Sequence, residues 1–198
     1  MARTRSASAH QKVLQATLDL VASRGIDATS MDAVARESGV SKATIYKHWA
    51  DKEALLLEML AWVNGLKDRP AFDTGNVRAD IAAVLAHRPA ENAERREAIT
   101  PHFVAYGAAN PSFGHTWRNM VMEPPRRELA HLIQKAIDAG DLPSNLDMEF
   151  ALAMLLGPIL YWHVFRRQHV GKELGGLAQQ VAAAFWEAFA LRRRRSSY

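Results

Sequence analysis

The stretch ATSMDAVARESGVSKATIYKHWADKEALL, residues 28–56, contains three helix starts in close succession. Each start has a side-chain oxygen that can accept a hydrogen bond from the first turn of a helix: Thr29 or Ser30, then Ser41, then Asp51. Gly39 can end the first helix and turn the chain into the second. Two short helices joined in this way are typical of a helix-turn-helix, whose second helix enters the DNA major groove. The expected helices are 31–37, 42–49 and 52–67.

The second of these helices has an apolar side and a polar side. Ala43, Ile45 and Trp49 can pack inward, and no acidic residue lies between Glu37 and Asp51. The other side chains offer hydrogen-bond donors and positive charge, which suit a polyanion. On these residues alone, a solvated face in a plain helical corner is the alternative. The donors are Lys42, Thr44, Tyr46, Lys47 and His48.

The rest of the chain also has helical periodicity. No run alternates apolar and polar residues with β-branched enrichment, so we predict an all-α fold. One further helix is expected before Gly25, over 10–24, and six after the helix-turn-helix, over 76–87, 93–109, 112–121, 126–139, 147–167 and 174–192. Kinks or breaks are expected at Pro101 and at Pro124–Pro125. We assign residues 1–51 to a helix-turn-helix domain and 52–198 to a larger helical domain, with the Pro- and Gly-containing stretch 69–75 as a candidate edge.

Charge and cysteine content narrow the class of protein. The 198 residues include no Cys, which excludes disulfide scaffolds, Cys-ligated zinc, iron–sulfur clusters and thiol nucleophiles. The net charge of +4 equals the four arginines at 192–195, so the rest of the chain is neutral. Residues 1–50 carry seven basic against four acidic side chains, an excess of 7 − 4 = +3. Any nucleic-acid affinity must come from this local excess, and the arginine run is either a nonspecific phosphate contact or a solvated terminus.

Motifs of enzymes, metal sites and membrane proteins are missing from the sequence. The eight His residues are scattered without metal-ligand spacing, and neither a Gly-rich phosphate loop nor a G-x-S-x-G motif occurs. We therefore expect no enzyme activity, no metal and no cofactor. The apolar segment Phe150–Phe165 is shorter than the roughly 20 residues of a membrane span. The segment MARTRSASAHQK has no apolar core for export, so we expect a cytoplasmic protein without membrane contact.

Residues 18–60 resemble the DNA-binding domain of the TetR (tetracycline-repressor) family of transcription regulators. The resemblance rests on a first helix ending in R-G, on ATSMDAVARESGVS, and on TIYKHW followed by DKEALL. It covers roughly residues 8–62. Trp49 stands where the family more often has Phe, and we expect a change in packing without loss of function because both are large apolar anchors.

The resemblance implies a set of DNA contacts, and the residue chemistry agrees with it. Hydroxyl, phenol and ammonium groups near a helix N-terminus suit phosphate oxygens, whereas lysine can reach guanine and alanine can touch a thymine methyl. Arg3 and Arg5 either enter a minor groove or belong to a solvated terminus. The implied phosphate contacts are Ser30, Thr44, Tyr46, His48 and Lys52, and the implied base-facing residues are Lys42, Ala43 and Lys47.

The last two helices offer a surface for a second copy of the chain. The segment Phe150–Phe165 is apolar on nearly all sides, and the last helix repeats apolar residues at helical spacing. Two such helices from each subunit would form a four-helix interface, the role they have in the TetR family. The alternative is that both fill a monomer core. The candidate interface residues are Phe150, Tyr161, Trp162, Phe165, Leu177, Val181, Phe185 and Phe189.

Aromatic and methionine side chains gather in the central helices. Such residues usually form core, but TetR-family members commonly hold a small-molecule effector there, which changes the spacing of their DNA-binding domains. The resemblance thus implies a homodimeric repressor that binds double-stranded DNA at an inverted-repeat operator and is released by a small, largely apolar effector. The alternative is an architectural DNA-binding protein without an effector. The candidate pocket residues are Trp62, Phe103, Tyr106, Phe113, Trp117, Met120 and Met154.

Overall fold

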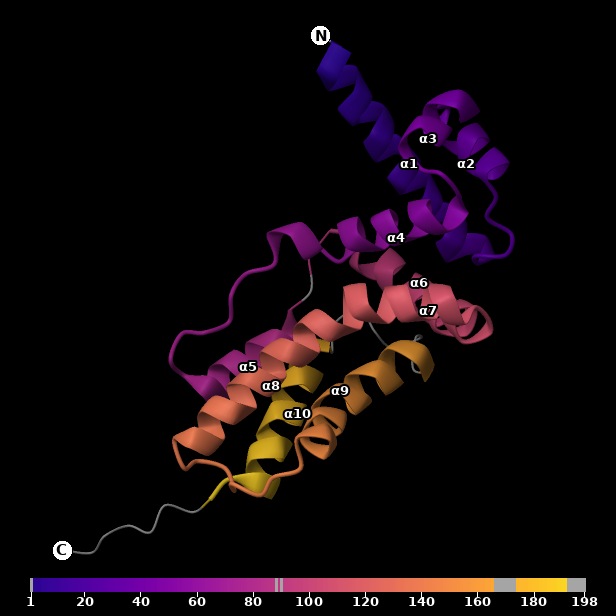
Figure 1. Cartoon of the computed structure of the whole chain (residues 1–198). Coiled ribbons are helices and arrows are strands. Elements are labelled where there is room, and N and C mark those ends of the chain that lie inside the picture. Colours follow the sequence, from indigo (N-terminus) through magenta and orange to yellow (C-terminus); the bar gives the residue numbers. More distant parts are fainter. Residues whose placement is uncertain (1, 88, 90, 166–173, 192–198) are drawn as a thin grey trace, which may run out of the picture. The chain divides into compact units, whose positions relative to one another are not determined.

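The computed structural model describes residues 2–87, 89, 91–165 and 174–191, and all regular structure in them is helical (Figure 1). The all-α prediction is confirmed. The arginine run at 192–195 lies outside the described residues. The elements are α1 (Ala2–Arg24), α2 (Met31–Ser38), α3 (Lys42–His48), α4 (Lys52–Val63), the 3-10 turn η1 (Leu66–Asp68), α5 (Val77–Ala86), α6 (Ala93–Ala109), α7 (Pro111–Trp117), the π turn η2 (Arg118–Met122), α8 (Glu123–Asp138), α9 (Met148–Phe165) and α10 (Leu174–Phe189).

Packing divides the chain into two compact units. The first comprises residues 1–69 and 88–121, and the second comprises residues 70–87 and 122–198. The first unit therefore combines the helix-turn-helix with α4, α6 and α7, whereas α5 joins α8, α9 and α10 in the second. The assignment of residues 1–51 to a helix-turn-helix domain and of residues 52–198 to a larger helical domain stays a prediction.

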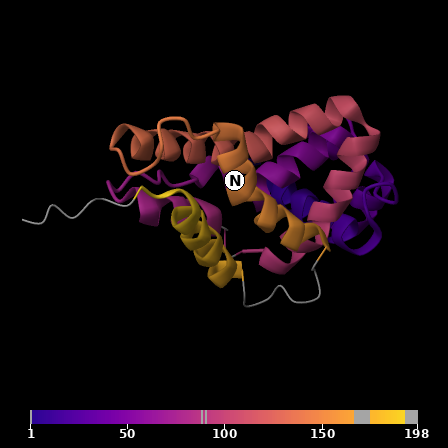
Figure 2. The ribbon, with the colours of Figure 1, turned by 90° about the horizontal axis from the view of Figure 1, so that it is seen from below.

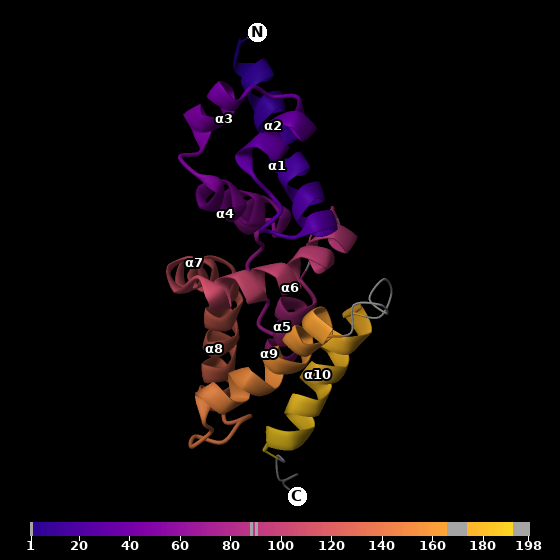
Figure 3. The same cartoon turned by 90° about the vertical axis from the view of Figure 1, so that its right-hand side faces the viewer.

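Helix α1 is the centre of the first unit. It packs against α2, α4 and α6, and α2 in turn packs against α3 (Figures 1 and 3). Its buried face carries Val13, Leu18 and Val21, at the spacing of one helix side. The fully buried Thr17 donates from Oγ1 to the Val13 carbonyl at 2.8 Å, so its hydroxyl is satisfied within the helix. The helix begins at Ala2, eight residues before the predicted start, and so includes the segment of Arg3 and Arg5.

Helices α6 and α7 meet at two glycines. A Cβ built on Gly114 would lie 3.0 Å from the carbonyl carbon of Gly107, so the two backbones touch without side chains between them. Pro101 lies inside α6. The break predicted at Pro124–Pro125 is replaced by the π turn η2, which leads directly into α8 with proline in its first turn, where a missing N–H costs no helical hydrogen bond.

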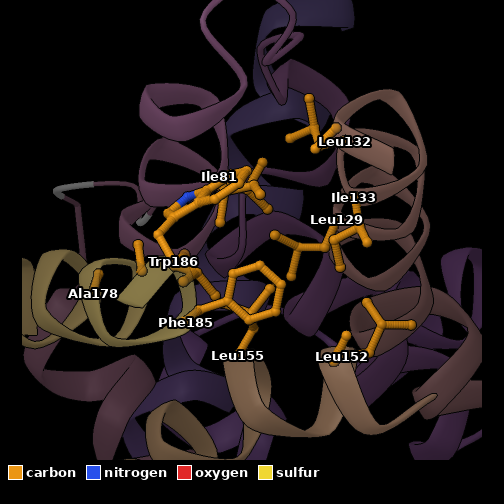
Figure 4. Packing of buried hydrophobic residues seen from close by; sticks show 14 of the residues in the cluster. Ile81, Leu129, Leu132, Ile133, Leu152, Leu155, Ala178, Phe185 and Trp186 are labelled. Carbon is orange, nitrogen blue, oxygen red and sulfur yellow. The ribbon is translucent and has the colours of Figure 1, made fainter. Parts of the chain in front are cut away.

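Four helices enclose the core of the second unit. Helix α5 packs against α8 and α10, and α9 packs against α8 and α10 (Figures 2 and 3). Ile81 from α5, Ile133 from α8, Leu155 from α9 and Phe185 from α10 point into the same cluster (Figure 4). The buried carboxylate of Asp80 accepts hydrogen bonds from the Thr74 N–H at 3.0 Å and from the Thr74 hydroxyl at 2.8 Å.

The described residues offer neither a membrane-spanning helix nor a cluster of metal-binding side chains. None of these helices is long and apolar enough to cross a membrane. Within the described ranges, no group of three or more His, Asp and Glu side chains is placed to hold a metal ion.

Candidate nucleic-acid interface

Each helix of the helix-turn-helix begins at a side-chain cap. Ser30 accepts from the Ala33 N–H at 3.1 Å, Ser41 from the Thr44 N–H at 3.3 Å, and Asp51 from the Ala54 N–H at 2.8 Å. Gly39 ends α2 with φ 68°, a left-handed conformation that favours glycine. The predicted starts of α2, α3 and α4 are confirmed. Helix α4 ends at Val63, four residues before the predicted end, because the chain turns at Gly65 with φ 59°.

Helix α3 turns one side inward and presents the other to solvent. Ile45 is 1% exposed and Trp49 is 2% exposed, as predicted. The expectation that Ala43 packs inward is wrong, because the structure leaves Ala43 exposed. Its short side chain allows the backbone of α3 to approach a surface closely. The exposed residues are Lys42, Ala43, Tyr46, Lys47 and His48, and Thr44 is half-buried.

The exposed donors of α3 differ in what they contact within the protein. Tyr46, with 52% of its surface exposed, and Lys47 form no hydrogen bond or ion pair with any described residue, so both are available to a ligand. The ammonium group of Lys42 instead forms an ion pair of 2.5 Å with Asp32 of α2. Both side chains are more than half exposed, and this pair must open before Lys42 can contact a base.

Among the implied phosphate contacts, Ser30 and Lys52 have partners inside the protein, and the Thr44 hydroxyl lies 2.9 Å from that of Ser41. The Ser30 hydroxyl accepts its capping hydrogen bond, which leaves its own hydrogen free for a phosphate oxygen. The half-buried Lys52 donates from Nζ to the Ile26 carbonyl at 3.3 Å and lies 5.5 Å from the centre of the Tyr106 ring. An ammonium group carries three hydrogens, so Lys52 retains donors for a phosphate.

The C-terminal end of α3 lies in a cluster that sequence reasoning missed. The Trp49 indole donates from Nε1 to Glu58 Oε2 at 2.6 Å, and His10 Nε2 lies 2.9 Å from Glu58 Oε1. The His10 ring stacks on Trp49 with centroids 4.6 Å apart, and the His48 ring lies 5.5 Å from both rings. Residues of α1, α3 and α4 thus meet at the carboxylate of Glu58.

Helix α6 contacts α1 and α4 through polar side chains. Arg95 forms an ion pair with Asp19 of α1, and the Tyr106 hydroxyl donates to Glu53 Oε1 of α4 at 3.2 Å. Burial of the phenol and this bond to a carboxylate raise the pKa of Tyr106 above its ordinary value. The buried Arg96 donates from Nη1 to the Val63 carbonyl at 3.3 Å, at the end of α4. Burial lowers the pKa of Arg96.

The predicted pocket residues fall into both units. Phe103 and Phe113 are buried between α6 and α7 with ring centroids 6.0 Å apart, and Tyr106 meets Phe113 edge to face at 5.0 Å. Trp117 is also buried, whereas Trp62 and Met120 are half-buried. Met154 is half-buried in the second unit. A separate groove of about 390 Å³, not predicted from the sequence, lies between α5 and α10 beside Arg78 and Trp186.

The predicted interface residues of α9 and α10 differ in exposure. Phe150, Tyr161 and Phe165 are exposed on α9, and Phe165 has 71% of its surface exposed. Leu160, which the prediction omitted, is exposed beside them. Phe185 is 1% exposed and belongs to the core of its own unit. The remaining predicted residues, Trp162, Leu177, Val181 and Phe189, are half-buried.

A capped helix-turn-helix with exposed donors on its second helix defines a DNA-binding protein of the helix-turn-helix class. The model of the family described as bacterial regulatory proteins, tetR family, matches residues 13–59. A second family model, the tetracyclin repressor-like C-terminal domain, matches residues 71–181. The chain therefore belongs to the TetR family of transcriptional regulators, as the sequence resemblance predicts.

Relatives of known sequence and structure agree with this family. The HTH-type transcriptional regulator YdeS of Bacillus subtilis is 31% identical over 160 residues, which cover 80% of each chain. A crystal structure of a TetR-family regulator from Mesorhizobium loti is 25% identical, with a TM-score of 0.63 over 94% of this chain and 99% of that one. The transcriptional regulator FadR of Bacillus subtilis, solved in complex with stearoyl-CoA, has a similar fold: it is 16% identical with a TM-score of 0.65 and covers 88% of this chain and 96% of that one.

Proposed function

We propose that this chain is a homodimeric repressor that binds an inverted-repeat operator through α3 and is released by a small, largely apolar effector. The observation that carries the proposal is the exposed side of α3, where the hydroxyl of Tyr46 and the ammonium group of Lys47 have no partner among the described residues. The two caps at Ser30 and Ser41 hold the adjacent helix N-termini, whose free N–H groups favour phosphate. We expect this activity in the cytoplasm, where bacterial DNA is found.

Within this interface we assign different tasks to neighbouring side chains. Tyr46 and Ser30 hold phosphates and set the register of α3, while Lys42, Ala43 and Lys47 face base edges. Tyr46→Phe should therefore weaken binding to all sequences alike, whereas Lys47→Ala should also relax the preference at particular bases. Equal losses on operator and random DNA for Lys47→Ala would contradict a base-reading role.

The test of the DNA target is selection of genomic fragments by the purified protein at a fixed, near-physiological salt concentration. Salt is fixed because counterion release dominates the measured affinity. We expect enrichment of an inverted repeat whose half-sites lie about one helical turn, or a multiple of it, apart. If no sequence is enriched after the protein has been unfolded and refolded to remove any copurified ligand, the proposal fails.

A second copy of the chain is the partner that fits the exposed side of α9. Phe150, Leu160, Tyr161 and Phe165 expose apolar area along one helix, and exposed apolar patches mark association surfaces. An inverted repeat also requires two recognition helices related by a two-fold axis. The exposed apolar residues of α9 support the homodimer in preference to a monomer whose last helices only fill its own core, and the proposed inverted repeat would require it.

The dimer can be tested with two matched substitutions at exposed tyrosines. Tyr161→Glu places a charge on α9, where it would be buried between subunits, and should give a monomer by light scattering coupled to size exclusion. Tyr46→Glu introduces the same charge on α3 at a similar exposure and should leave the dimer intact while abolishing operator binding. A dimeric Tyr161→Glu protein would contradict an interface at this side of α9.

Support for effector control comes from α6, which has aromatic pocket candidates and also contacts α1 and α4. Phe103 and Tyr106 belong to the predicted pocket, and α6 contacts α1 and α4 through Arg95, Arg96 and Tyr106. A ligand that prefers a different placement of α6 would shift the population of DNA-binding conformations. Each tenfold loss of operator affinity needs about 1.4 kcal/mol of coupling.

Effector control is tested by release of a fluorescent operator duplex in a panel of small apolar compounds. We expect a subset to release the operator at concentrations that leave the fold intact. Tyr106→Phe removes the hydrogen bond to Glu53 and should change the amount of release more than the affinity for the compound. Operator binding that is insensitive to the panel and to refolding would favour an effector-independent DNA-binding protein.

A further inference from the structure

Helix α3 has few side chains of its own that fix its position. It is seven residues long, and Ile45 is its one buried residue. Trp49, which follows α3 as its C-cap residue, is the second buried anchor, and its backbone N–H donates to the Ile45 carbonyl at 3.0 Å. The placement of the helix at a DNA groove therefore depends on how firmly Trp49 is held.

Glu58 of α4 holds Trp49 through a directional bond. The indole Nε1 donates to Glu58 Oε2 at 2.6 Å, a short hydrogen bond to a charged acceptor. The other carboxylate oxygen, Oε1, lies 2.9 Å from His10 Nε2. A carboxylate only accepts hydrogen bonds, so His10 Nε2 must carry a hydrogen. One side chain of α4 thus connects α1 to the end of α3.

The stacked His10 ring completes this arrangement. Its centroid lies 4.6 Å from that of Trp49 at an interplanar angle of 29°, so the indole is held against α1 by its face and against α4 by its edge. A phenylalanine at position 49 would keep the packing but could not donate to Glu58. Binding residues must be held within about 0.5 Å of the productive geometry, and the directional bond from the indole adds a restraint that packing alone does not provide.

We propose that Glu58 is a positioning residue for DNA recognition: it fixes α3 by accepting hydrogen bonds from Trp49 and His10, without contacting DNA itself. The inference rests on the proposed role of α3 in operator binding. The proposal predicts that loss of the Glu58 charge weakens operator binding, whereas electrostatic attraction alone would strengthen it. Removing a negative charge from a DNA-binding domain should strengthen binding to a polyanion, whereas loosening α3 should weaken operator binding.

The experiment compares full-length variants on the selected operator and on random duplex of the same length, at one salt concentration. Glu58→Ala should lower operator affinity about tenfold, which is about 1.4 kcal/mol, and leave random-DNA affinity unchanged or higher. Glu58→Gln keeps an oxygen that can accept from the indole, so it should restore most of the operator affinity. Glu37→Ala removes the same charge from an exposed side chain of α2 and serves as the control for net charge.

Two further measurements separate positioning from folding. The Trp49–Glu58 bond changes the expectation from sequence that phenylalanine at position 49 has no functional effect: Trp49→Phe should lower operator affinity. Adding Glu58→Ala to Trp49→Phe should cost much less than Glu58→Ala alone, because the shared bond is already gone. In nuclear magnetic resonance spectra, the indole N–H signal of Trp49 is assigned as the one that disappears in Trp49→Phe. Its hydrogen exchange should be slow in the wild type and in Glu58→Gln, and fast in Glu58→Ala.

The binding measurements distinguish failure of the proposed operator binding from failure of the proposed role of Glu58. If the wild-type protein binds operator and random DNA equally, the proposed function fails. If the wild type discriminates and Glu58→Ala discriminates equally well, or loses affinity equally on both duplexes, the positioning role is overturned. Additive losses in the double variant, or unchanged indole exchange in Glu58→Ala, would overturn the bond on which the role depends.

Discussion

Substitution of Gly114 by alanine should test the close approach of α6 and α7. The added Cβ would lie 3.0 Å from the carbonyl carbon and 3.1 Å from the Cα of Gly107, and closer still to the Gly107 oxygen. Real Cβ atoms essentially never come closer than 3.0 Å, and the opposing atoms here are backbone. No side-chain rotation can relieve the contact, so the two helices must separate. Gly176 of α10 is the matched control, because no atom of the described residues lies within 4 Å of its Cβ position.

Two opposing effects determine the change in the free energy of unfolding of Gly114→Ala. Alanine stabilises a helix by about 0.8–1 kcal/mol relative to glycine, and this term applies to both sites. At Gly114 the overlap adds the cost of overpacking, about 1–3 kcal/mol or more, and separation would also loosen the contact of Phe103 with Phe113. We expect Gly114→Ala to be destabilised by about 2 kcal/mol, a fall of about 4–8 °C in Tm. Gly176→Ala should be stabilised by about 0.5–1 kcal/mol.

The assay is thermal and urea unfolding followed by circular dichroism. All variants must be compared at one protein concentration, because self-association makes Tm depend on concentration. The decisive quantity is the difference in free energy of unfolding between Gly114→Ala and Gly176→Ala. If Gly114→Ala gains as much stability as Gly176→Ala, the helices do not meet at these glycines and the reasoning is refuted.

Three further predictions concern charge and capping. Asp32→Asn should raise the affinity for both operator and random DNA about 1.4- to fivefold by freeing Lys42, since an exposed ion pair contributes about 0.2–1 kcal/mol. An unchanged affinity by fluorescence anisotropy would contradict this. The hydrogen bond and charge of Lys135 hold the pKa of Asp73 below its ordinary value of 3.8. The Asp73–Lys135 pair therefore stabilises the fold above pH 3.8, and this stabilisation is lost as the pH falls through the folded-state pKa of Asp73. Asp73→Asn should therefore show a shallower loss of stability in acid when urea midpoints are measured from neutral pH downward, and a parallel decline would argue against the pair. Ser41→Ala removes the cap of α3 and should cost about 1 kcal/mol, with faster amide exchange confined to the first turn of that helix.

Local signals were sufficient to predict the helices of the DNA-binding region. Ser30, Ser41 and Asp51 each act within three residues of their own position, so the printed sequence contains both partners of every cap. Gly39 ends α2 because a left-handed conformation is required at that point. The inward direction of Ile45 and Trp49 follows from helical spacing, and the structure confirms both.

Interactions between elements could not be predicted in the same way. The partner of Trp49 is Glu58, nine residues further on and on another helix, and the buried Arg96 reaches a carbonyl 33 residues away. Their pairing depends on how α1, α4 and α6 pack, which no local pattern encodes. Phe185 illustrates the same limit: an apolar residue at helical spacing can face either the core or a partner, and here it faces the core of its own unit.

The ion pair between Lys42 and Asp32 has a consequence for the search for a target along the chromosome. If Lys42 faces base edges as proposed, the pair opens only where a base contact compensates for its loss and stays closed on other DNA. A paired Lys42 adds no attraction to a nontarget stretch, so the residence time there is shorter than with a free ammonium group. A protein that must scan on the order of 10⁶ competing sites gains from leaving each of them sooner. On the proposed role of Lys42, we therefore expect Asp32 to favour a fast survey of the genome over tight attachment to any one stretch of it.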